Sequence, residues 1–374
     1  MKIHSHQGAA IRYQIDVINP DGTLADSRPW RRNLILNRGL EDIASYRWDE
    51  VVNYAVAGKG TDPTKRASGE VTFTQNGTTV TASAGFFVAQ DAGRLLKLDT
   101  GEEMPIEAYT DTTTVTVATA RTSAIPTPGT VWYVNQTGLA AEYMRTSTLG
   151  TGADDNSVNL LDGKIVLKRT FVFAAVSQQV TIQEVGWSRW NGAGGNLFGR
   201  DVLAAGGVTL VSGQQLKIVL ELAITVSPLA PENIAFPAWI AGGGKQQLEN
   251  LNWNHRFHPC NAYNYYIPVF VSDSTDIHKA AHLESGAGSL TGTVKTVEPI
   301  RANYIGGSRR YTYRATFTIN DGNIAVVRCA GFGWWDYQTF YPIFRIIFDQ
   351  PQTKDSDHTL TLDFEISWGR VLIN

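Results

Sequence analysis

The sequence lacks several features that mark large classes of protein. Only two of its 374 residues are cysteine, charged residues make up 18% of the chain, and the net charge is −3. No apolar run reaches the roughly 18 residues of a membrane-spanning helix, and the first residues lack the apolar segment of a signal peptide. Lysine and arginine form no block longer than two residues. These absences argue against a disulfide scaffold, a helical membrane protein and a nucleic-acid-binding protein, which needs a concentrated basic surface.

What the chain does contain favours β-structure. It has 35 glycines and is rich in aromatic residues, with 15 Phe, 14 Tyr and 10 Trp. Short stretches of alternating apolar and polar residues are separated by Gly, Pro, Asn and Asp, as in antiparallel sheets. Nothing shows the alternation of strands and helices that a parallel sheet requires. The composition and patterning therefore predict an all-β protein.

Two stretches of the sequence resemble each other. The matched positions are Phe171 with Phe317, Gly186-Trp187 with Gly333-Trp334, Phe198 with Phe344, and Leu216 to Leu222 with Leu360 to Ile366. The separations are 146, 147, 146 and 144 residues. Loop-length differences between two copies of one β-unit would produce so small a spread. The repeat predicts two related β-sandwiches in tandem.

The first copy carries an extra block that the second lacks. Six short apolar segments lie between about Gly69 and Gly138, Asn76-Gly77 is a hairpin signal between the first two, and Pro126-Thr-Pro128-Gly129 is expected to break the chain before the last. Upstream, Leu36, Leu40 and Ile43 share one helical face, and Asn33 can cap the first turn. This is the best helix candidate in the chain.

Together these patterns predict two tandem antiparallel β-sandwich, jelly-roll-like domains, with a small β-rich insert domain in the first. The expected spans are 1–66 for the opening part of the first sandwich with one short helix, 67–138 for an inserted small barrel or sandwich, 139–229 for the closing part, and 230–374 for the second sandwich.

The glycine-rich, histidine, cysteine and acidic segments of the chain lack the complete patterns of chemical sites. Gly242-Gly-Gly244-Lys245 lacks the other residues of a phosphate-binding loop. His255-x-x-His258-x-Cys260 and His278-x-x-x-His282 match no zinc spacing, and the second pair would share one face only in a helix. His4-x-His6 offers only two residues per chain for an axial ion in a homotrimer. Cys260 and Cys329 are expected to be buried thiols, and whether they pair stays open. Adjacent acidic pairs such as Asp49-Glu50 face opposite ways in a strand, and no nucleophile motif occurs. We therefore expect no catalytic residue, no cofactor and no metal.

Aromatic residues are the remaining candidates for a site. Trp187 and its expected counterpart Trp334 are interpreted as plugs between sheets. Consecutive tryptophans on one strand cannot both point inward, so one is expected at the surface. Exposed aromatic rings serve either as protein–protein anchors or as platforms for sugars. The predicted contact residues are Trp334, Trp335, Tyr337, Tyr265 and Tyr266.

Several motifs resemble those of tailed-bacteriophage virion proteins. Residues 33–40 have the pattern NLIL-x-x-GL, and residues 58–63 have G-x-G-T-x-P. Further along are Ile182-Gln-Glu184-Val-Gly186, similar to I-x-E-V-G, and Asn196-Leu-Phe198-Gly-Arg200, similar to N-L-F-x-R. The resemblance continues from Gly213 to Leu222. It covers roughly residues 30–226.

The resemblance implies a non-enzymatic structural component of a virion, made in the host cytoplasm, in a tail, baseplate or fibre-attachment region. The expected partners are other virion subunits in a symmetric homo-oligomer, with no nucleic acid and no membrane span. One alternative is a carbohydrate-binding receptor-recognition module that binds a host surface glycan. A second alternative is a head decoration or head-fibre protein.

Overall fold

The computed structural model describes residues 2–46, 50–151, 156–161, 164–192, 196–203, 206–227, 247–250, 269–272, 277–279, 288–290, 293–302, 304–321, 324–336, 339–354 and 357–371. Within these ranges the chain is almost entirely β-strand, with one α-helix and one 3-10 helix. Nearly all strand pairs are antiparallel. The predicted all-β fold class is confirmed. The division into the four spans given above stays a prediction.

The first half folds around one long strand path. The path runs β10-β11-β16-β1-β3-β14-β13-β4-β9. It turns from one layer into the other at β3, whose first residues pair with β1 and whose last residues pair with β14. The strands outside the insert are β1 (Lys2–Ile18), β2 (Leu24–Ser27), β3 (Arg31–Ile35), β4 (Tyr54–Gly58), β9 (Glu142–Thr146), β10 (Asn156–Leu161), β11 (Lys164–Val172), β12 (Val180–Ile182), β13 (Glu184–Ser188), β14 (Leu197–Val202), β15 (Val208–Leu210) and β16 (Gln215–Ser227).

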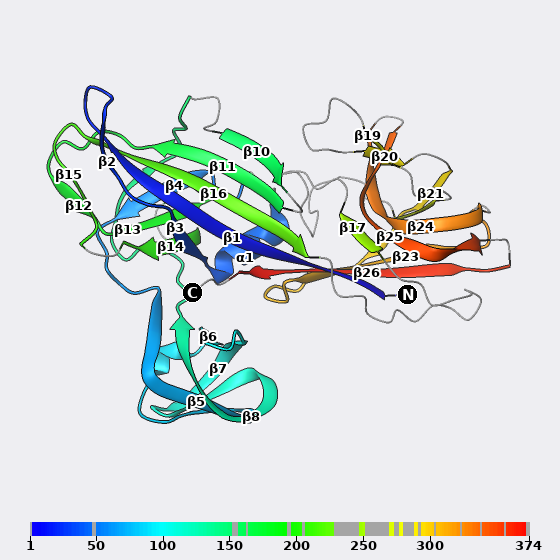
Figure 1. Ribbon diagram of the computed structural model, residues 1–374, viewed down its shortest axis with the longest axis horizontal. Helices are drawn as coiled ribbons and strands as arrows, with labels where there is room; N and C mark the ends of the chain where they lie inside the picture. The colour runs from blue at the N-terminus through cyan, green and yellow to red at the C-terminus, as the bar shows by residue number, and fades with distance from the viewer. Residues whose placement is uncertain are drawn as a thin grey trace.

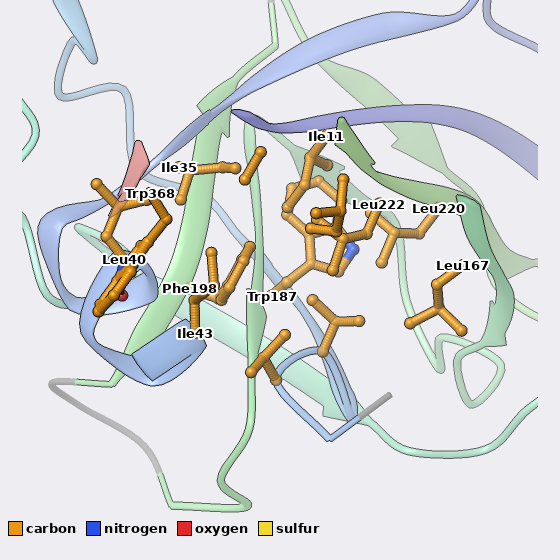
Figure 2. Close-up of a cluster of buried hydrophobic side chains, with 14 of the residues drawn as sticks. Ile11, Ile35, Leu40, Ile43, Leu167, Trp187, Phe198, Leu220, Leu222 and Trp368 are labelled. Carbon is orange, nitrogen blue, oxygen red and sulfur yellow. Dashed lines mark hydrogen bonds between the residues drawn. The ribbon is translucent and has the colours of Figure 1, made fainter. Parts of the chain in front are cut away.

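The two layers enclose an apolar core. Alternate residues of β1, from Ile11 to Val17, are buried, and so are the facing residues of β16 from Leu216 to Ile224. Trp187 lies at the centre, with its ring centroid 5.1 Å from that of Tyr13. Figure 2 shows these side chains converging from both layers and from the helix. The predicted role of Trp187 as a core plug is confirmed.

The helix forms later in the sequence than its motif predicts. Helix α1 spans Asn37–Ser45, and its N-cap, Leu36, makes no side-chain capping bond. Asn33 lies in β3, so its predicted capping role is wrong. Strand pairing of residues 33–35 with β1 and β14 prevails over the helical pattern there. Leu40 and Ile43 are buried in the core as the periodicity predicts.

The insert forms its own sheet below the first half (Figure 1). It contains β5 (Lys65–Ala82), a 3-10 turn (Ala89–Asp91), β6 (Leu95–Leu98), β7 (Glu103–Asp111) and β8 (Thr114–Trp132). Strand β8 pairs with β5, β6 and β7, and β6 also pairs with β7, so the sheet closes on itself. A separate apolar cluster that includes Phe73, Phe87 and Val115 fills it.

Two turn predictions in the insert are wrong. Asn76 and Gly77 lie within β5, opposite Thr122 and Arg121, and form no hairpin. Register shifts next to them absorb the positive φ of Gly77. The segment Pro126–Gly129 lies within β8, because its neighbours still pair with β5 and β6. Six expected short strands are therefore mostly merged into two long bent strands, and β7 was not predicted.

The second half has two layers. One consists of β22, β23 and β26 beside the beginning of β1, and the other has the order β17-β25-β24-β18-β21. Its strands are β17 (Gln247–Asn250), β18 (Val269–Ser272), β19 (Ile277–Lys279), β20 (Gly288–Leu290), β21 (Val294–Val297), β22 (Ile300–Arg301), β23 (Arg310–Phe317), β24 (Ile324–Asp336), β25 (Thr339–Lys354) and β26 (Leu360–Arg370).

Strand pairing in the second half repeats that of the first. Strand β13 lies between β4 and β14, and β24 lies between β18 and β25. Gly186 faces Arg200 and Gly331 faces Arg345, so both partners are displaced by 145 residues. Both ladders then change register after the next residue, at Trp187 and Phe332 respectively. By register the counterpart of Trp187 is therefore Phe332, and the expected match with Trp334 is wrong.

In the other layer, where β11 pairs with β16 and β23 pairs with β26, corresponding residues of the two halves are separated by nearly the same number of positions. Phe173 donates its backbone N–H to Leu216, and Phe317 is paired with Leu360. Both members of this pair are displaced by 144 residues, which makes Phe173 the counterpart of Phe317 in place of Phe171. The sequence aligned aromatic residues two positions apart because both positions face the core.

Candidate functional site

The predicted aromatic contact residues are only partly placed by the structure. Trp334 and Trp335 lie in β24, opposite Tyr341 and Phe340 of β25. Their side chains lie outside what the structure describes, as do residues Tyr337, Tyr265 and Tyr266 altogether. This contact set stays a prediction.

Three of the sequence motifs quoted above meet at one point, where the insert joins the rest of the first half. Glu184 of β13 is fully buried there. Its Oε1 accepts the backbone N–H groups of Gly60 at 3.0 Å and Ala141 at 2.8 Å, and its Oε2 accepts that of Ala140 at 3.0 Å. The carboxylate thereby ties together the chain entering the insert and the chain leaving it.

Arg200 of β14 completes this arrangement. Its Nε and Nη2 donate to Glu184 Oε2 at 3.0 and 2.7 Å, and both side chains are fully buried. Its Nη1 donates to Gln136 Oε1 at 2.8 Å, and Gln136 donates in turn to the carbonyl of Pro63 at 3.3 Å. We call Gly60, Gln136, Ala140–Ala141, Glu184 and Arg200 the motif clamp.

The electrostatics of the motif clamp keep Glu184 charged. Burial alone would raise the pKa of the Glu184 carboxyl, but the backbone N–H of Ala141, the Arg200 guanidinium and the N–H of Ala140 outweigh it. The pKa of Glu184 is therefore lowered from its ordinary 4.5. Five donors occupy the carboxylate and solvent does not reach it. In this arrangement Glu184 is a structural acceptor of hydrogen bonds.

Two motif glycines are required by close approach. A Cβ on Gly60 would collide with Glu184 Oε1 and with Ala140. A Cβ on Gly39, the glycine of NLIL-x-x-GL, would collide with the backbone carbonyl of Phe198, the aromatic residue of N-L-F-x-R. Helix α1 can lie against β14 only because residue 39 has no side chain.

The same part of helix α1 also contacts the second half. Trp368 of β26 donates its indole N–H to the carbonyl of Leu40 at 2.8 Å, and its ring stacks on Tyr304 with centroids 5.6 Å apart. The Tyr304 hydroxyl donates to Glu41 Oε2 at 2.8 Å. Figure 2 shows Trp368 beside Leu40 in the same apolar cluster as Trp187. The helix therefore joins the two halves through one continuous core.

Two arginines converge beside this contact. Arg370 and Arg309 both donate to Asn37 Oδ1, at 2.5 and 2.6 Å, and Arg370 also donates to the carbonyl of Ile35 at 2.9 Å. Burial, together with a smaller effect of the neighbouring Arg309, lowers the pKa of Arg370 to about 9. Arg309 adopts a left-handed backbone, with φ of 49°. The contacts that Trp368, Tyr304, Arg309 and Arg370 make with the helix and β3 were not predicted from the sequence. No local sequence pattern could reveal these contacts, because the two partners of each lie more than 250 residues apart in the chain.

A second, partly buried polar group links β1, β3 and β14. The Tyr13 hydroxyl donates to Asp201 Oδ2 at 2.6 Å, and Arg31 contacts both groups. Burial raises the pKa of Tyr13, and burial also raises the pKa of Asp201. The phenol thus remains protonated and serves to satisfy the carboxylate.

The histidines and cysteines of the described residues form no metal centre. Among the described residues no three His, Cys, Asp or Glu side chains are placed to hold a metal ion. His278 lies in strand β19, so the helical arrangement considered for it does not form, and His255, His258, Cys260 and His282 lie outside the described residues. His4 and His6 lie in β1, where only their backbone is described, and Cys329 is buried. No helix in the described ranges is long and apolar enough to cross a membrane.

Comparisons with known proteins identify no relative. No family model matches the chain, no curated protein matches it, and no solved structure matches it.

Proposed function

We propose that this protein is a non-enzymatic structural component of a tailed-phage virion, placed in the tail, the baseplate or a fibre-attachment region. It would assemble with other virion subunits as a symmetric homo-oligomer. The proposal rests on the sequence resemblance, and one structural observation supports it more than any other.

That observation is the meeting of separate motifs in the motif clamp. Gly60 comes from G-x-G-T-x-P, Glu184 from I-x-E-V-G and Arg200 from N-L-F-x-R. Gly39 of NLIL-x-x-GL packs on Phe198 of the same last motif. The motifs therefore share a mechanical purpose, which is to hold a projecting insert and the connecting helix on a β-scaffold. In the buried ion pair of Glu184 and Arg200 every carboxylate lone pair accepts a hydrogen bond, which fixes the orientation of the insert. The carboxylate therefore has no free position from which to act in bond cleavage.

The shape of the chain also suits an assembly part. The insert has its own core and extends away from the two halves, as Figure 1 shows. The helix and β26 bind the two halves into one body. Such a body can present the insert at a fixed angle to a neighbouring subunit.

The test is to locate the protein in particles and then remove the insert. Cross-linking mass spectrometry on purified virions should give cross-links from this chain to tail, baseplate or fibre subunits. Cross-links to capsid subunits alone would favour the head decoration or head-fibre alternative. Absence of the protein from purified virions would refute the proposal.

An insert-deleted variant makes the test sharper. The Tyr133 N–H donates to the Thr64 carbonyl at 2.9 Å, so a short Gly/Ser linker can join these residues in place of 65–132. If the insert holds a neighbour, particles with the deletion should lose that neighbour and keep this chain. A matched control replaces only Ile125, which is exposed on the insert, with Ser.

One feature favours the alternative of a glycan-binding module. Trp190 is 47% exposed, and the Arg189 guanidinium lies 4.0 Å from its ring centroid and 3.4 Å from that of Tyr46. An exposed ring beside a fixed guanidinium can stack on a sugar and bind its hydroxyls. A glycan array should then show binding that Trp190→Ala abolishes, and an array without any binding excludes this alternative.

A further inference from the structure

Strand β1 belongs to both halves of the molecule. Its residues His6–Ile18 pair antiparallel with Ser227–Gln215 of β16 in the first half. Its residues Lys2–Ala9 pair in parallel with Asp363–Arg370 of β26 in the second half. The Val371 N–H donates to the Ala9 carbonyl at 2.8 Å, which closes the end of this ladder. One strand therefore supplies hydrogen bonds to both sandwiches.

The second half depends on this borrowed strand. Every second residue of β26 is buried, from Leu360 to Trp368. On one side β26 pairs with β23, and on the other side, in the described part of the chain, it pairs with β1 alone. Without β1 an eleven-residue strand would present a row of unpaired backbone groups, and such an edge readily takes up another strand.

The borrowed segment continues directly into the part of β1 that belongs to the first half. Residues Lys2–Ser5 are paired only with β26 in the described ladders, while His6–Ala9 lie between β16 and β26. We call residues 2–9 the N-terminal arm. Because these contacts are backbone ladders to β16 and β26, the arm of a second copy could take the place of this arm and make the same contacts.

We infer that β26 is a strand-acceptor edge, filled here by the arm of the same chain and able to take the arm of a second copy, so that copies associate by reciprocal strand exchange. Exchange replaces each contact with an identical one, so local protein concentration decides between the two arrangements. The inference deepens the proposed assembly function by naming the partner as a second copy of this chain. It rests on that function only for its biological purpose.

The test is a disulfide trap on the full-length protein. His4 faces Glu365 in the parallel ladder, and paired Cα atoms of neighbouring strands are about 5 Å apart, within disulfide reach. A chain with His4→Cys is co-expressed with a chain with Glu365→Cys and the mixture is oxidised. We expect a covalent heterodimer that contains the 4–365 cross-linked peptide and whose yield rises with protein concentration. Each variant alone controls for the native cysteines.

Two matched variants make the result decisive. The pair His4→Cys and Thr361→Cys places the second cysteine on the same side of β26, four residues away and about 13 Å out of register. We expect it to give at most on the order of a tenth of the heterodimer, because disulfides do not span more than about 7 Å. The double variant His4→Cys/Glu365→Cys in one chain reports the pairing within the molecule.

Two outcomes of the disulfide experiment would contradict the inference. A cross-link within the double variant, combined with no heterodimer at any concentration, would show that the arm stays in its own chain and would overturn the inference. Failure of the double variant to cross-link would overturn the pairing itself. Neither result touches the position of the protein in a particle, which the virion cross-linking measures separately.

Discussion

Replacement of Glu184 by glutamine is the most direct test of the motif clamp. The variant keeps the size of the side chain and removes its charge. Arg200 is then left fully buried without its counter-ion, and one of the two acceptor oxygens becomes an amide that faces the N–H groups of the insert junction. Loss of one partner from a buried ion pair typically destabilises a protein by about 3–5 kcal/mol.

That energy should be visible in thermal unfolding. For a unit of 150–250 residues each 1 kcal/mol shifts the melting temperature by about 2–4 °C, so we expect a decrease of roughly 6–20 °C for the Glu184→Gln protein. Hydrogen exchange followed by mass spectrometry should locate the change. Peptides that cover residues 58–64 and 133–141 should exchange faster, while peptides of β26 should not.

The stability that Glu184 contributes should depend on pH. Because the pKa of Glu184 is lowered in the folded state, its contribution is complete above its ordinary pKa of 4.5 and is lost as the pH falls through the folded value. The variant and the wild type should therefore differ most at neutral pH and converge in acid. Asp363→Asn, which breaks the exposed pair of Asp363 with Arg314, is the matched control and should change little. If the Glu184→Gln protein melted with the wild type at pH 7, the clamp would have no energetic role.

Three further predictions concern the helix and its contacts. Gly39→Ala should destabilise the first half by about 1–3 kcal/mol in chemical denaturation, because the new methyl group collides with the Phe198 carbonyl. The control Gly85→Ala should be close to neutral, because its methyl group would meet only the Thr112 side chain at 3.5–3.6 Å. Trp368→Phe keeps an aromatic ring but removes the hydrogen bond to the Leu40 carbonyl. It should lower the free energy of unfolding by about 1 kcal/mol and speed hydrogen exchange in helix α1. Unchanged exchange in the helix would contradict the proposed contact between the halves. Burial raises the pKa of Asp42 from 3.8 to about 6 against the opposing effect of Arg38 and Arg189, so stability should fall as the pH rises from about 4 to 6. Asp42→Asn lacks this loss and should gain on the order of 3 kcal/mol relative to wild type between those pH values; parallel pH profiles of the two proteins would refute the assignment.

The sequence by itself determined the all-β fold class, whereas its division into domains with an insert stays a prediction. Alternation of apolar residues along β1, β16 and β26 predicts half-buried strands, because side chains in a strand point alternately to opposite faces. The same regularity revealed the repeat. It could not fix the register, because a shift of two residues keeps every side chain on its face, and Phe171 and Phe173 are equally buried.

Turn-forming residues in the sequence did not form turns where long-range strand pairing competed with them. Asn76-Gly77 and Pro126–Gly129 are turn residues in isolation, yet long-range pairing of β5 with β8 keeps both within strands. Asn33 was likewise drawn into β3 by its pairing with β1. In each case hydrogen bonds to a distant strand prevailed over the local preference of a few residues.

Only the tertiary structure decided how the motifs work together. Gly39, Gly60, Glu184 and Arg200 stand in four separate motifs, and nothing in their spacing shows that they meet. The contact of Trp368 with Leu40, and the sharing of β1 by the two halves, join residues more than 300 positions apart. Such contacts depend on chain topology, since the sequence records which faces are apolar and the fold alone determines which faces adjoin.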